Sequence, residues 1–187
     1  MRRALLPAVL CTLAILAVPA TASAAGPVVQ GGLVKTELAN SGNLRMGNLN
    51  GGAYKIGFEV GSHRWRSEWA FNQTLLNGYS YATSGDHKLT LTGFSYQLSF
   101  LFRETGFSPY VGLGAEMGLA SLQESGWAYN YAYSYSETSD GGYIRPYGIL
   151  GLRMQFGFGL ALRGEVSASY YGDFVSMNTA LGISYTW

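Results

Sequence analysis

The feature that most constrains this chain is a strict alternation of apolar and polar side chains. Between Phe94 and Phe102 every second residue is aromatic or leucine, and Ser95, Gln97 and Ser99 stand between them. Because successive side chains of a β-strand point to opposite faces, this period indicates strands with one apolar face. The 26 glycines and 14 tyrosines among 187 residues would weaken a helical bundle. The alternation therefore predicts an all-β protein.

The alternation recurs along the chain and predicts eight strands, which span residues 27–38, 52–61, 64–75, 88–102, 109–122, 143–156, 160–171 and 177–187. Their connections differ in length. Short turns are expected at 62–63, 103–108 and 157–159, and longer loops at 39–51, 76–87 and 123–142, with a shorter one at 172–176. Short turns on one side and longer loops on the other are typical of a membrane barrel. An even number of strands places both chain ends on the side of the short turns.

Two kinds of barrel alternate in this way, and they differ in which face is apolar. A soluble barrel packs apolar residues inward, whereas a membrane barrel turns them toward lipid. Here the polar faces mix glycines with charges of both signs, which suits a narrow filled lumen. The apolar faces carry bulky aromatic residues near the ends of the segments, like the aromatic girdles of membrane barrels. These residues are Trp65, Trp69, Phe94, Phe102, Tyr170, Tyr185 and Trp187. We therefore expect an eight-stranded antiparallel transmembrane β-barrel, with Leu98 toward lipid and Gln97 toward the lumen.

The first 24 residues have the pattern of a signal peptide. Two arginines precede an apolar run at 4–18, and the sequence Ala-Ser-Ala at 22–24 fits a cleavage site. Cleavage after Ala24 would leave one barrel domain at 25–187. The single cysteine, Cys11, would leave with the signal peptide, so the mature chain would form no disulfide.

The charge balance excludes one class of partner. Without the signal peptide the chain has ten Lys and Arg residues against eleven Asp and Glu residues. Nucleic-acid binding needs a basic excess that neutralises phosphates, and this chain has none.

Three stretches resemble the small eight-stranded outer-membrane barrels, the group of OmpA-type transmembrane domains and opacity-type surface proteins. Residues 107–114 resemble a strand opening after a periplasmic turn, 160–166 the penultimate strand, and 181–187 the closing strand. The resemblance implies a bacterial outer-membrane location and contacts with outer-membrane lipid and lipopolysaccharide. It also implies an assembly machinery that reads the end of the closing strand, here Leu181, Ile183, Tyr185 and Trp187. The family usually closes on Phe, whereas this chain closes on Trp.

Nine charged residues fall on the polar faces and are candidates for ion pairs inside the lumen. Unpaired charges in a narrow lumen of low dielectric are very unfavourable, so we expect acids and bases to pair there. For Glu116 we expect a partner in Arg153 or Arg163. Such pairs fit either a static plug or a gated channel whose pairs exchange. The nine are Lys55, Glu59, Arg66, Glu68, Glu116, Arg145, Arg153, Arg163 and Glu165.

Five aromatic residues recur at period two between the fifth and sixth predicted strands. As a strand they would share one face and could stack on sugars or on a host protein. The alternative is that the two strands continue above the bilayer and the tyrosines lie among lipopolysaccharide headgroups. The five residues are Trp127, Tyr129, Tyr131, Tyr133 and Tyr135.

No catalytic centre, metal site or cofactor is predicted. His63 falls in a short turn, and Asp86 and His87 are adjacent, so in a strand they would point to opposite faces. We expect a structural or surface-interaction protein with a lumen plugged by ion pairs and an extracellular ligand that the sequence does not identify. The alternatives are a small channel for ions or solutes and, more distantly, an enzyme that acts on lipid or peptide.

Deletion of Trp187 is expected to impair assembly, because this residue ends the apolar stripe of the closing strand. Export should be unchanged, since residues 1–24 are intact, while the folded, heat-modifiable form in outer membranes should decrease. The gel mobility of unheated membrane samples measures that form. Wild-type amounts in the deletion variant would contradict the expected role of Trp187.

Overall fold

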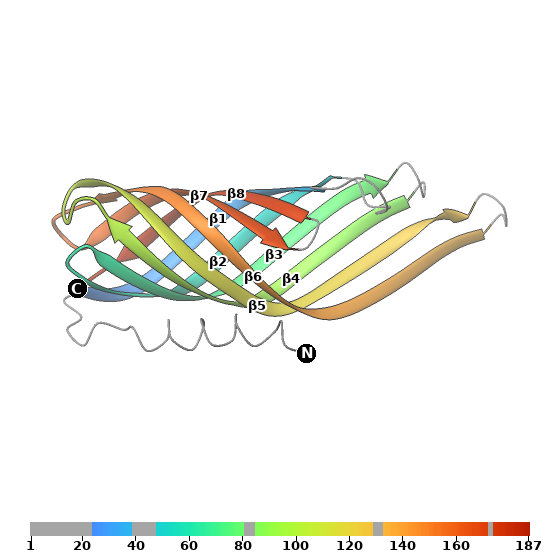
Figure 1. Ribbon diagram of the computed structural model, residues 1–187, viewed down its shortest axis with the longest axis horizontal. Coiled ribbons are helices and arrows are strands. Elements are labelled where there is room, and N and C mark those ends of the chain that lie inside the picture. Colours follow the sequence, from blue (N-terminus) through green and yellow to red (C-terminus); the bar gives the residue numbers. More distant parts are fainter. Residues whose placement is uncertain (1–23, 39–47, 81–84, 129–132, 172–173) are drawn as a thin grey trace.

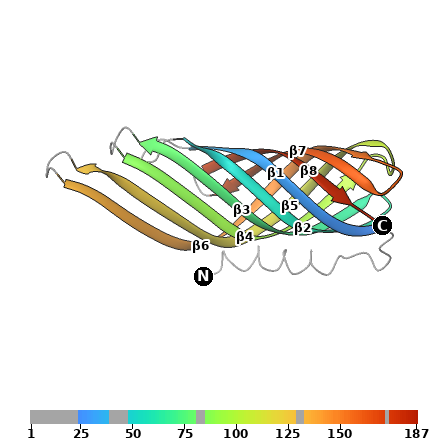
Figure 2. The same ribbon diagram turned by 180° about the vertical axis from the view of Figure 1, so that it is seen from behind.

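The chain forms a closed barrel of eight antiparallel strands, in which each strand pairs with the strands before and after it (Figure 1, Figure 2). The computed structural model describes residues 24–38, 48–80, 85–128, 133–171 and 174–187. The predicted all-β fold and the eight strands are confirmed. The strands are β1 (Ala24–Leu38), β2 (Leu49–Ser62), β3 (Trp65–Ser80), β4 (Gly85–Leu101), β5 (Phe107–Ala128), β6 (Tyr133–Gln155), β7 (Leu160–Tyr171) and β8 (Phe174–Tyr185). Among the described residues, no helix is long and apolar enough to cross a membrane.

Pairing of β1 with β8 closes the barrel and brings the two ends of the described chain together. Val28 lies opposite Ser184, and Ala25 and Trp187 are joined by backbone hydrogen bonds of 3.4 and 3.1 Å. Lipid offers no partner to backbone N–H and C=O groups, so a sheet crosses a membrane only when it is closed. The ends lie at the end of the barrel that carries the short turns, as the even number of strands predicts (Figure 1).

Tight turns close one end of the barrel, which we call the turn end. His63, between β2 and β3, has a φ of 51°, and Gly106 and Gly159 have φ values of 70° and 90°. A positive φ is unstrained for glycine and uncommon for other residues, so the two glycines suit their turns better than His63 does. We call the opposite end the loop end. Strands β3 to β6 extend beyond the other strands there.

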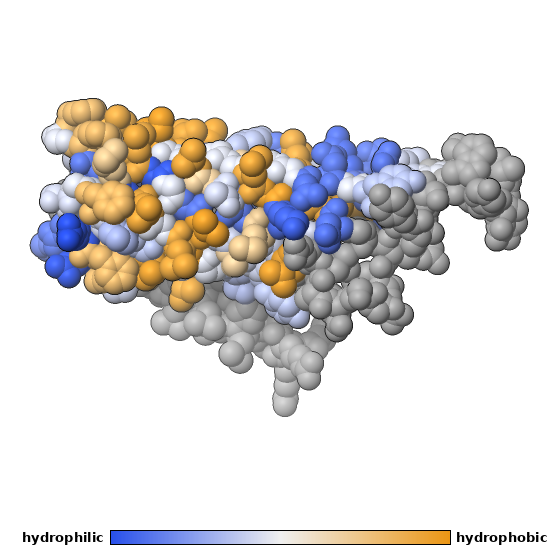
Figure 3. Space-filling view, turned by 90° about the horizontal axis from the view of Figure 1, so that it is seen from above, coloured by the Kyte–Doolittle hydropathy of each residue, from blue (hydrophilic) through white to orange (hydrophobic). Residues whose placement is uncertain are grey.

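The outer surface of the barrel is apolar and the lumen is polar. Five outward-facing leucines on four strands are between 65% and 77% exposed, and they are Leu33, Leu113, Leu119, Leu150 and Leu181. The inward-facing Gln30, Gln97 and Ser184 are buried. Figure 3 shows hydrophobic side chains spread over the turn-end part of one outer face. This arrangement is the inverse of a soluble barrel and gives the chain a lipid-facing belt.

The aromatic residues expected at the strand ends all face outward, but not all lie at an end. Trp65 begins β3, and its ring contacts that of Phe100 with centroids 5.1 Å apart. Phe94 lies opposite Phe71 and well inside β4. The expectation that Phe94 marks a strand end is therefore wrong, because β4 extends further toward the loop end than its apolar stripe.

Strands β3 to β6 run further at the loop end than the sequence predicts. The loops expected at 76–87 and 123–142 are wrong over most of their length. In the structure β3 and β4 pair as far as Ser80 opposite Gly85, and β5 and β6 as far as Ala128 opposite Tyr133. The alternation marks only the part of a strand that faces lipid. Beyond the bilayer both faces meet water, so Ser, Thr and Gly residues pair there without an apolar stripe.

The longest of these projections is a ribbon of β5 and β6. Pairing of β6 with β7 begins only at Tyr147 opposite Ser169, so the ribbon rises far beyond β7, whereas β4 pairs with β5 as far as Gly85 opposite Gly126 (Figure 1, Figure 2). We call residues 121–128 and 133–140 the β5–β6 extension. It supports the interpretation that strands five and six continue past the lipid-facing belt.

Substitution of arginine for Leu113 tests the lipid-facing belt. Leu113 is 74% exposed on the outer face of β5, and a midplane arginine in a transmembrane barrel costs about 2–4 kcal/mol. Gln123→Arg is the matched control, because Gln123 lies on the same face of the same strand but in the β5–β6 extension. Urea unfolding in lipid vesicles should show the loss for Leu113→Arg alone. Equal stability of the two variants would place the belt elsewhere.

Candidate functional site in the barrel lumen

The nine charged residues singled out in the sequence all lie on the inner face of the barrel. Each of their side chains is at most 14% exposed, and they comprise five bases and four acids. They come from β2, β3, β5, β6 and β7 and occupy two groups. The larger group lies toward the turn end and consists of Lys55, Glu59, Arg66, Glu68, Arg153, Arg163 and Glu165; we call it the lumen network. The smaller group is the pair Glu116 and Arg145.

Glu59 of β2 is contacted by three arginines. One guanidinium nitrogen of Arg153, on β6, donates to both carboxylate oxygens at 2.6 and 2.8 Å. Arg163 lies 3.4 Å and Arg66 3.7 Å from the same carboxylate. Strands β2 and β6 are not neighbours in the sheet, so the Glu59–Arg153 pair bridges the lumen.

Glu68 of β3 and Glu165 of β7 share their two basic partners. The guanidinium of Arg163 lies 2.5 Å from Glu68 and 2.8 Å from Glu165, and the Lys55 ammonium lies 2.7 and 3.3 Å from them. The Tyr110 hydroxyl donates a further hydrogen bond of 2.6 Å to Glu165. Because Arg163 also contacts Glu59, the contacts join all seven residues of the lumen network into one connected group.

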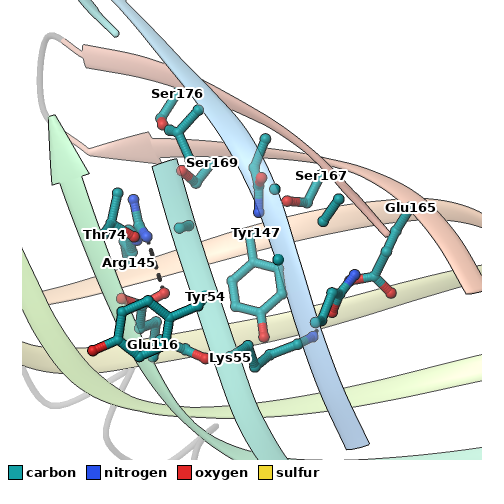
Figure 4. Close-up of a pocket in the computed structure, with 18 residues that line it drawn as sticks. Tyr54, Lys55, Thr74, Glu116, Arg145, Tyr147, Glu165, Ser167, Ser169 and Ser176 are labelled. Carbon is teal, nitrogen blue, oxygen red and sulfur yellow. Dashed lines mark hydrogen bonds and ion pairs between the residues drawn. The ribbon is translucent and has the colours of Figure 1, made fainter. Parts of the chain in front are cut away.

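Glu116 and Arg145 form a separate pair nearer the loop end, joined at 3.0 Å (Figure 4). Tyr143 also donates its hydroxyl to Glu116. The expectation that Glu116 pairs with Arg153 or Arg163 is therefore wrong. The strand register explains the difference, because Glu116 lies directly opposite Arg145 in the β5–β6 ladder.

The rings of two inward-facing tyrosines, Tyr110 and Tyr147, pack over glycines of a neighbouring strand. A Cβ added at Gly151 would overlap the ring of Tyr110, and a Cβ added at Gly114 would overlap the ring of Tyr147. Glycine is required at these two positions because the rings approach the backbone so closely. The space over Gly151 lets the Tyr110 hydroxyl reach Glu165.

Two cavities lie between the lumen network and the loop end. A polar cavity of about 60 Å³ is bordered by Lys55, Glu116 and Arg145 (Figure 4). It offers enough polar partners to hold water. A second cavity of about 280 Å³ lies nearer the loop end and is mainly apolar. Neither is lined by Glu59, Arg153 or Arg163, so the lumen network separates both from the turn end.

The apolar lining of the larger cavity was missed in the sequence. Leu49 and Leu76 are 1% exposed and Leu91 is 8% exposed, all on the inner face. Leu49 and Leu76 fall in segments that the sequence assigns to loops. The inward direction of Leu91 could have been predicted from the sequence. Leu91 lies six residues before the lumen-facing Gln97, and residues an even number of positions apart in a strand share one face.

The period-two aromatic residues belong to the β5–β6 extension or to its connection. Trp127, Tyr133 and Tyr135 lie on paired backbone, with Tyr135 opposite Gly126. Tyr129 and Tyr131 lie outside the described residues. Their role in binding stays a prediction.

The two histidines do not form a catalytic arrangement with Asp86. His87 is buried on the inner face of β4, with Nδ1 3.2 Å from Glu124, whereas Asp86 is exposed on the other face. His63 is exposed in its turn, 4.0 Å from Glu104. In the part of the chain that the structure describes, no group of three or more His, Cys, Asp or Glu side chains could hold a metal ion.

Comparison with known proteins shows what this arrangement is similar to. No family model and no curated protein matches the chain. Among solved structures, Ail, the attachment invasion locus protein of Yersinia pestis, is 18% identical, with 89% of this chain and 100% of that chain covered and a TM-score of 0.53. Neisserial surface protein A is 18% identical, with 87% and 98% covered and a TM-score of 0.54.

The chain has the fold of the small outer-membrane barrels. The expected resemblance to this type of barrel is confirmed at the level of the fold. The lipid-facing belt of this chain agrees with it.

A double-mutant cycle tests the pairing of Glu116. The cycle of Glu116→Gln with Arg145→Met should show a coupling of about 0.5–3 kcal/mol in the free energy of unfolding in urea, as for residues in direct contact. The control cycle of Glu116→Gln with Arg163→Met should be additive within about 0.5 kcal/mol, because Arg163 contacts other carboxylates. Additivity of the first cycle, or stronger coupling in the second, would contradict the observed pairing.

Proposed function

We propose that the protein is a non-conducting outer-membrane barrel that presents the β5–β6 extension to a partner outside the cell. The lumen network is the observation that supports a barrel that does not conduct. Its seven charged side chains come from β2, β3, β6 and β7, and the Glu59–Arg153 pair crosses the lumen between strands that are not neighbours.

An ion could pass this network only by displacing several charge pairs together. The carboxylate of Glu59 is held by three arginines, and that of Glu68 by Arg163 and Lys55. Breaking a buried pair leaves a charge without compensation, typically at about 3–5 kcal/mol. Because neighbouring pairs share Arg163, opening one pair disturbs the others. These contacts favour the static plug over the gated channel.

The second half of the proposal rests on the shape and charge of the β5–β6 extension. The extension contains Glu124, Glu137 and Asp140 and no Lys or Arg. Glu124 lies directly opposite Glu137 on the neighbouring strand, and His87 Nδ1 lies 3.2 Å from the Glu124 carboxylate. A cationic partner would reduce the like-charge repulsion between Glu124 and Glu137. We therefore propose a partner with a basic surface.

This charge argues against a polyanionic ligand. One structure of Ail, 18% identical to this chain with a TM-score of 0.50, is a complex with the heparin analogue sucrose octasulfate. A sulfated ligand of that kind would be repelled by the three carboxylates of the extension described above. The period-two aromatic residues of the sequence, Trp127 among them, remain candidates for contact with such a partner.

Three further parts of the proposal concern placement in the envelope. Residues 1–24 direct export and are removed, the lipid-facing belt contacts outer-membrane lipid and lipopolysaccharide, and the assembly machinery reads the stripe that ends at Trp187. Contact of the lipid-facing belt with lipid is supported by the direction of the side chains. Every charged residue of the lumen network points inward, and the belt carries apolar side chains.

Planar-bilayer recording tests the plug. The wild-type barrel should give no discrete openings, whereas the double variant Glu59→Ser/Arg153→Ser should conduct, because it removes the pair that crosses the lumen. Arg64→Ser/Glu104→Ser is the matched control, since it removes an exposed ion pair of 3.9 Å at the turn end and should stay silent. Stable openings of the wild-type barrel would overturn the plug and favour the small channel.

Shortening the ribbon tests the contact surface. Leu122 lies opposite Ser139, so replacing residues 123–138 by Asn-Gly leaves a two-residue hairpin turn in register. The wild-type barrel in nanodiscs should bind immobilised basic proteins of the extracellular matrix and lose this binding in the shortened variant. Binding to heparin instead, or equal binding by the shortened variant, would contradict a basic partner for the extension. The silent bilayer record should be the same for both proteins.

A further inference from the structure

The apolar cavity at the loop end is a second feature of the lumen and is independent of the lumen network. Its volume is about 280 Å³, close to the lower limit of about 300 Å³ for small-molecule pockets. Its apolar walls are inward-facing leucines of β2, β3, β4 and β5, namely Leu49, Leu76, Leu89, Leu91 and Leu122. Its polar lining includes Thr36, Ser139, Ser169 and Ser176. Arg145 and Tyr143 border it on the side of the lumen network.

The leucine part of this lining does not suit water, and among its polar residues the Thr36 hydroxyl donates to the Ser176 hydroxyl at 3.1 Å. A buried water needs two to four polar partners, and a cavity lined by leucines stays dry and takes up apolar molecules. Near the lumen network, the Arg145 guanidinium and the Tyr143 hydroxyl are already engaged by Glu116. The walls therefore favour an apolar group, and the volume suits a single narrow chain.

The cavity is open beside the edge of β6 that faces β7. Between Tyr133 and Pro146 this strand has only β5 as a partner within the described residues, because its pairing with β7 begins at Tyr147. Gly141 and Gly142 border the cavity on this stretch, and no atom of the described chain lies within 4 Å of the Cβ position of Gly141. A ligand can therefore reach the leucines past a wall without side chains.

The charge beside this opening is negative. Asp140 lines the cavity and is exposed, and the other charged residues of the β5–β6 extension are Glu124 and Glu137. Arg145 brings no free positive charge, because Glu116 neutralises it at 3.0 Å. A head group placed at the opening therefore meets carboxylates.

We propose that this cavity binds one alkyl chain of a cationic amphiphile, with the chain between the leucines and an ammonium head group beside Asp140. The site requires neither conduction nor a protein partner, so it goes beyond the proposed function. Alkylammonium compounds carry both features in one molecule. Amphiphiles with uncharged or anionic head groups are the alternatives that the test separates.

Paramagnetic broadening of leucine methyl signals tests the site in the full barrel in nanodiscs. The probe is a dodecyltrimethylammonium that carries a nitroxide near the end of its tail. Lipid-facing leucines such as Leu113 should broaden in every sample, because the probe partitions into the bilayer. Leu76 and Leu91 should broaden more strongly than the buried Leu101, which does not line the cavity, only if the chain enters the cavity. Sharp Leu76 and Leu91 signals beside a broadened Leu113 signal would overturn the proposal.

Two substitutions at neighbouring positions of β5 provide the control. Ala120→Phe fills the cavity from its inner wall, and Leu119→Phe adds the same ring on the lipid-facing side. Broadening of Leu76 and Leu91 should disappear in Ala120→Phe and persist in Leu119→Phe. If Ala120→Phe does not fold, Leu122→Gln replaces it, because it makes the same wall polar without adding volume. Unchanged broadening in the folded cavity variant would contradict binding at this site.

The head group is tested by a change at the opening. Asp140→Asn should weaken binding of the cationic probe about two- to fivefold, the effect of one exposed ion pair, and leave an uncharged dodecyl maltoside probe unaffected. Tighter binding of dodecyl sulfate than of the ammonium probe to the wild-type barrel would overturn the cationic head group. Planar-bilayer recordings of the same samples should show no openings. Binding at the cavity is then judged independently of whether the lumen conducts.

Discussion

Charges inside an eight-stranded barrel must be neutralised by other charges, because the lumen leaves little room for water. This constraint follows from the membrane itself. Lipid cannot satisfy backbone polar groups, so the sheet closes between β1 and β8, and closure of so few strands makes the interior narrow. Glu59, with three arginines around it, shows the result most clearly. The two glycines under Tyr110 and Tyr147 belong to the same arrangement, since side chains there would displace the rings.

The lumen is divided into parts of different chemistry from the turn end to the loop end. The lumen network comes first, then a small polar cavity beside the pair of Glu116 and Arg145, and then the apolar cavity among the leucines. In the proposed plug, the lumen network would close the turn end and leave the leucine-lined cavity on the loop-end side. A barrel of this kind can hold a small ligand near one end while conducting nothing, so the proposed plug and the proposed alkyl-chain site are compatible.

The alternation of side chains was enough to predict the strands and their two faces, because the lipid-facing belt depends on that period. It did not predict how far β5 and β6 extend, since a ribbon that meets water on both faces needs no apolar stripe. It placed Arg145 and Glu116 in the lumen but not beside each other. That pairing depends on the strand register, which the polar faces alone leave open. The cavity at the loop end was missed because Leu49 and Leu76 lie outside the spans in which the alternation is clear.

The most direct test of the account asks whether the lumen network separates the two ends of the barrel. Residues 25–187 contain no cysteine, so single cysteines can be introduced at Ser176 and Ser184 on the same inner face of β8. Ser176 lines the cavities toward the loop end, and Ser184 lies toward the turn end. On intact cells, a charged thiol reagent that does not cross membranes should modify Ser176→Cys and leave Ser184→Cys intact, and should reach Ser184→Cys once Glu59 and Arg153 are both replaced by serine. Modification of Ser184→Cys with the network unchanged would contradict the account.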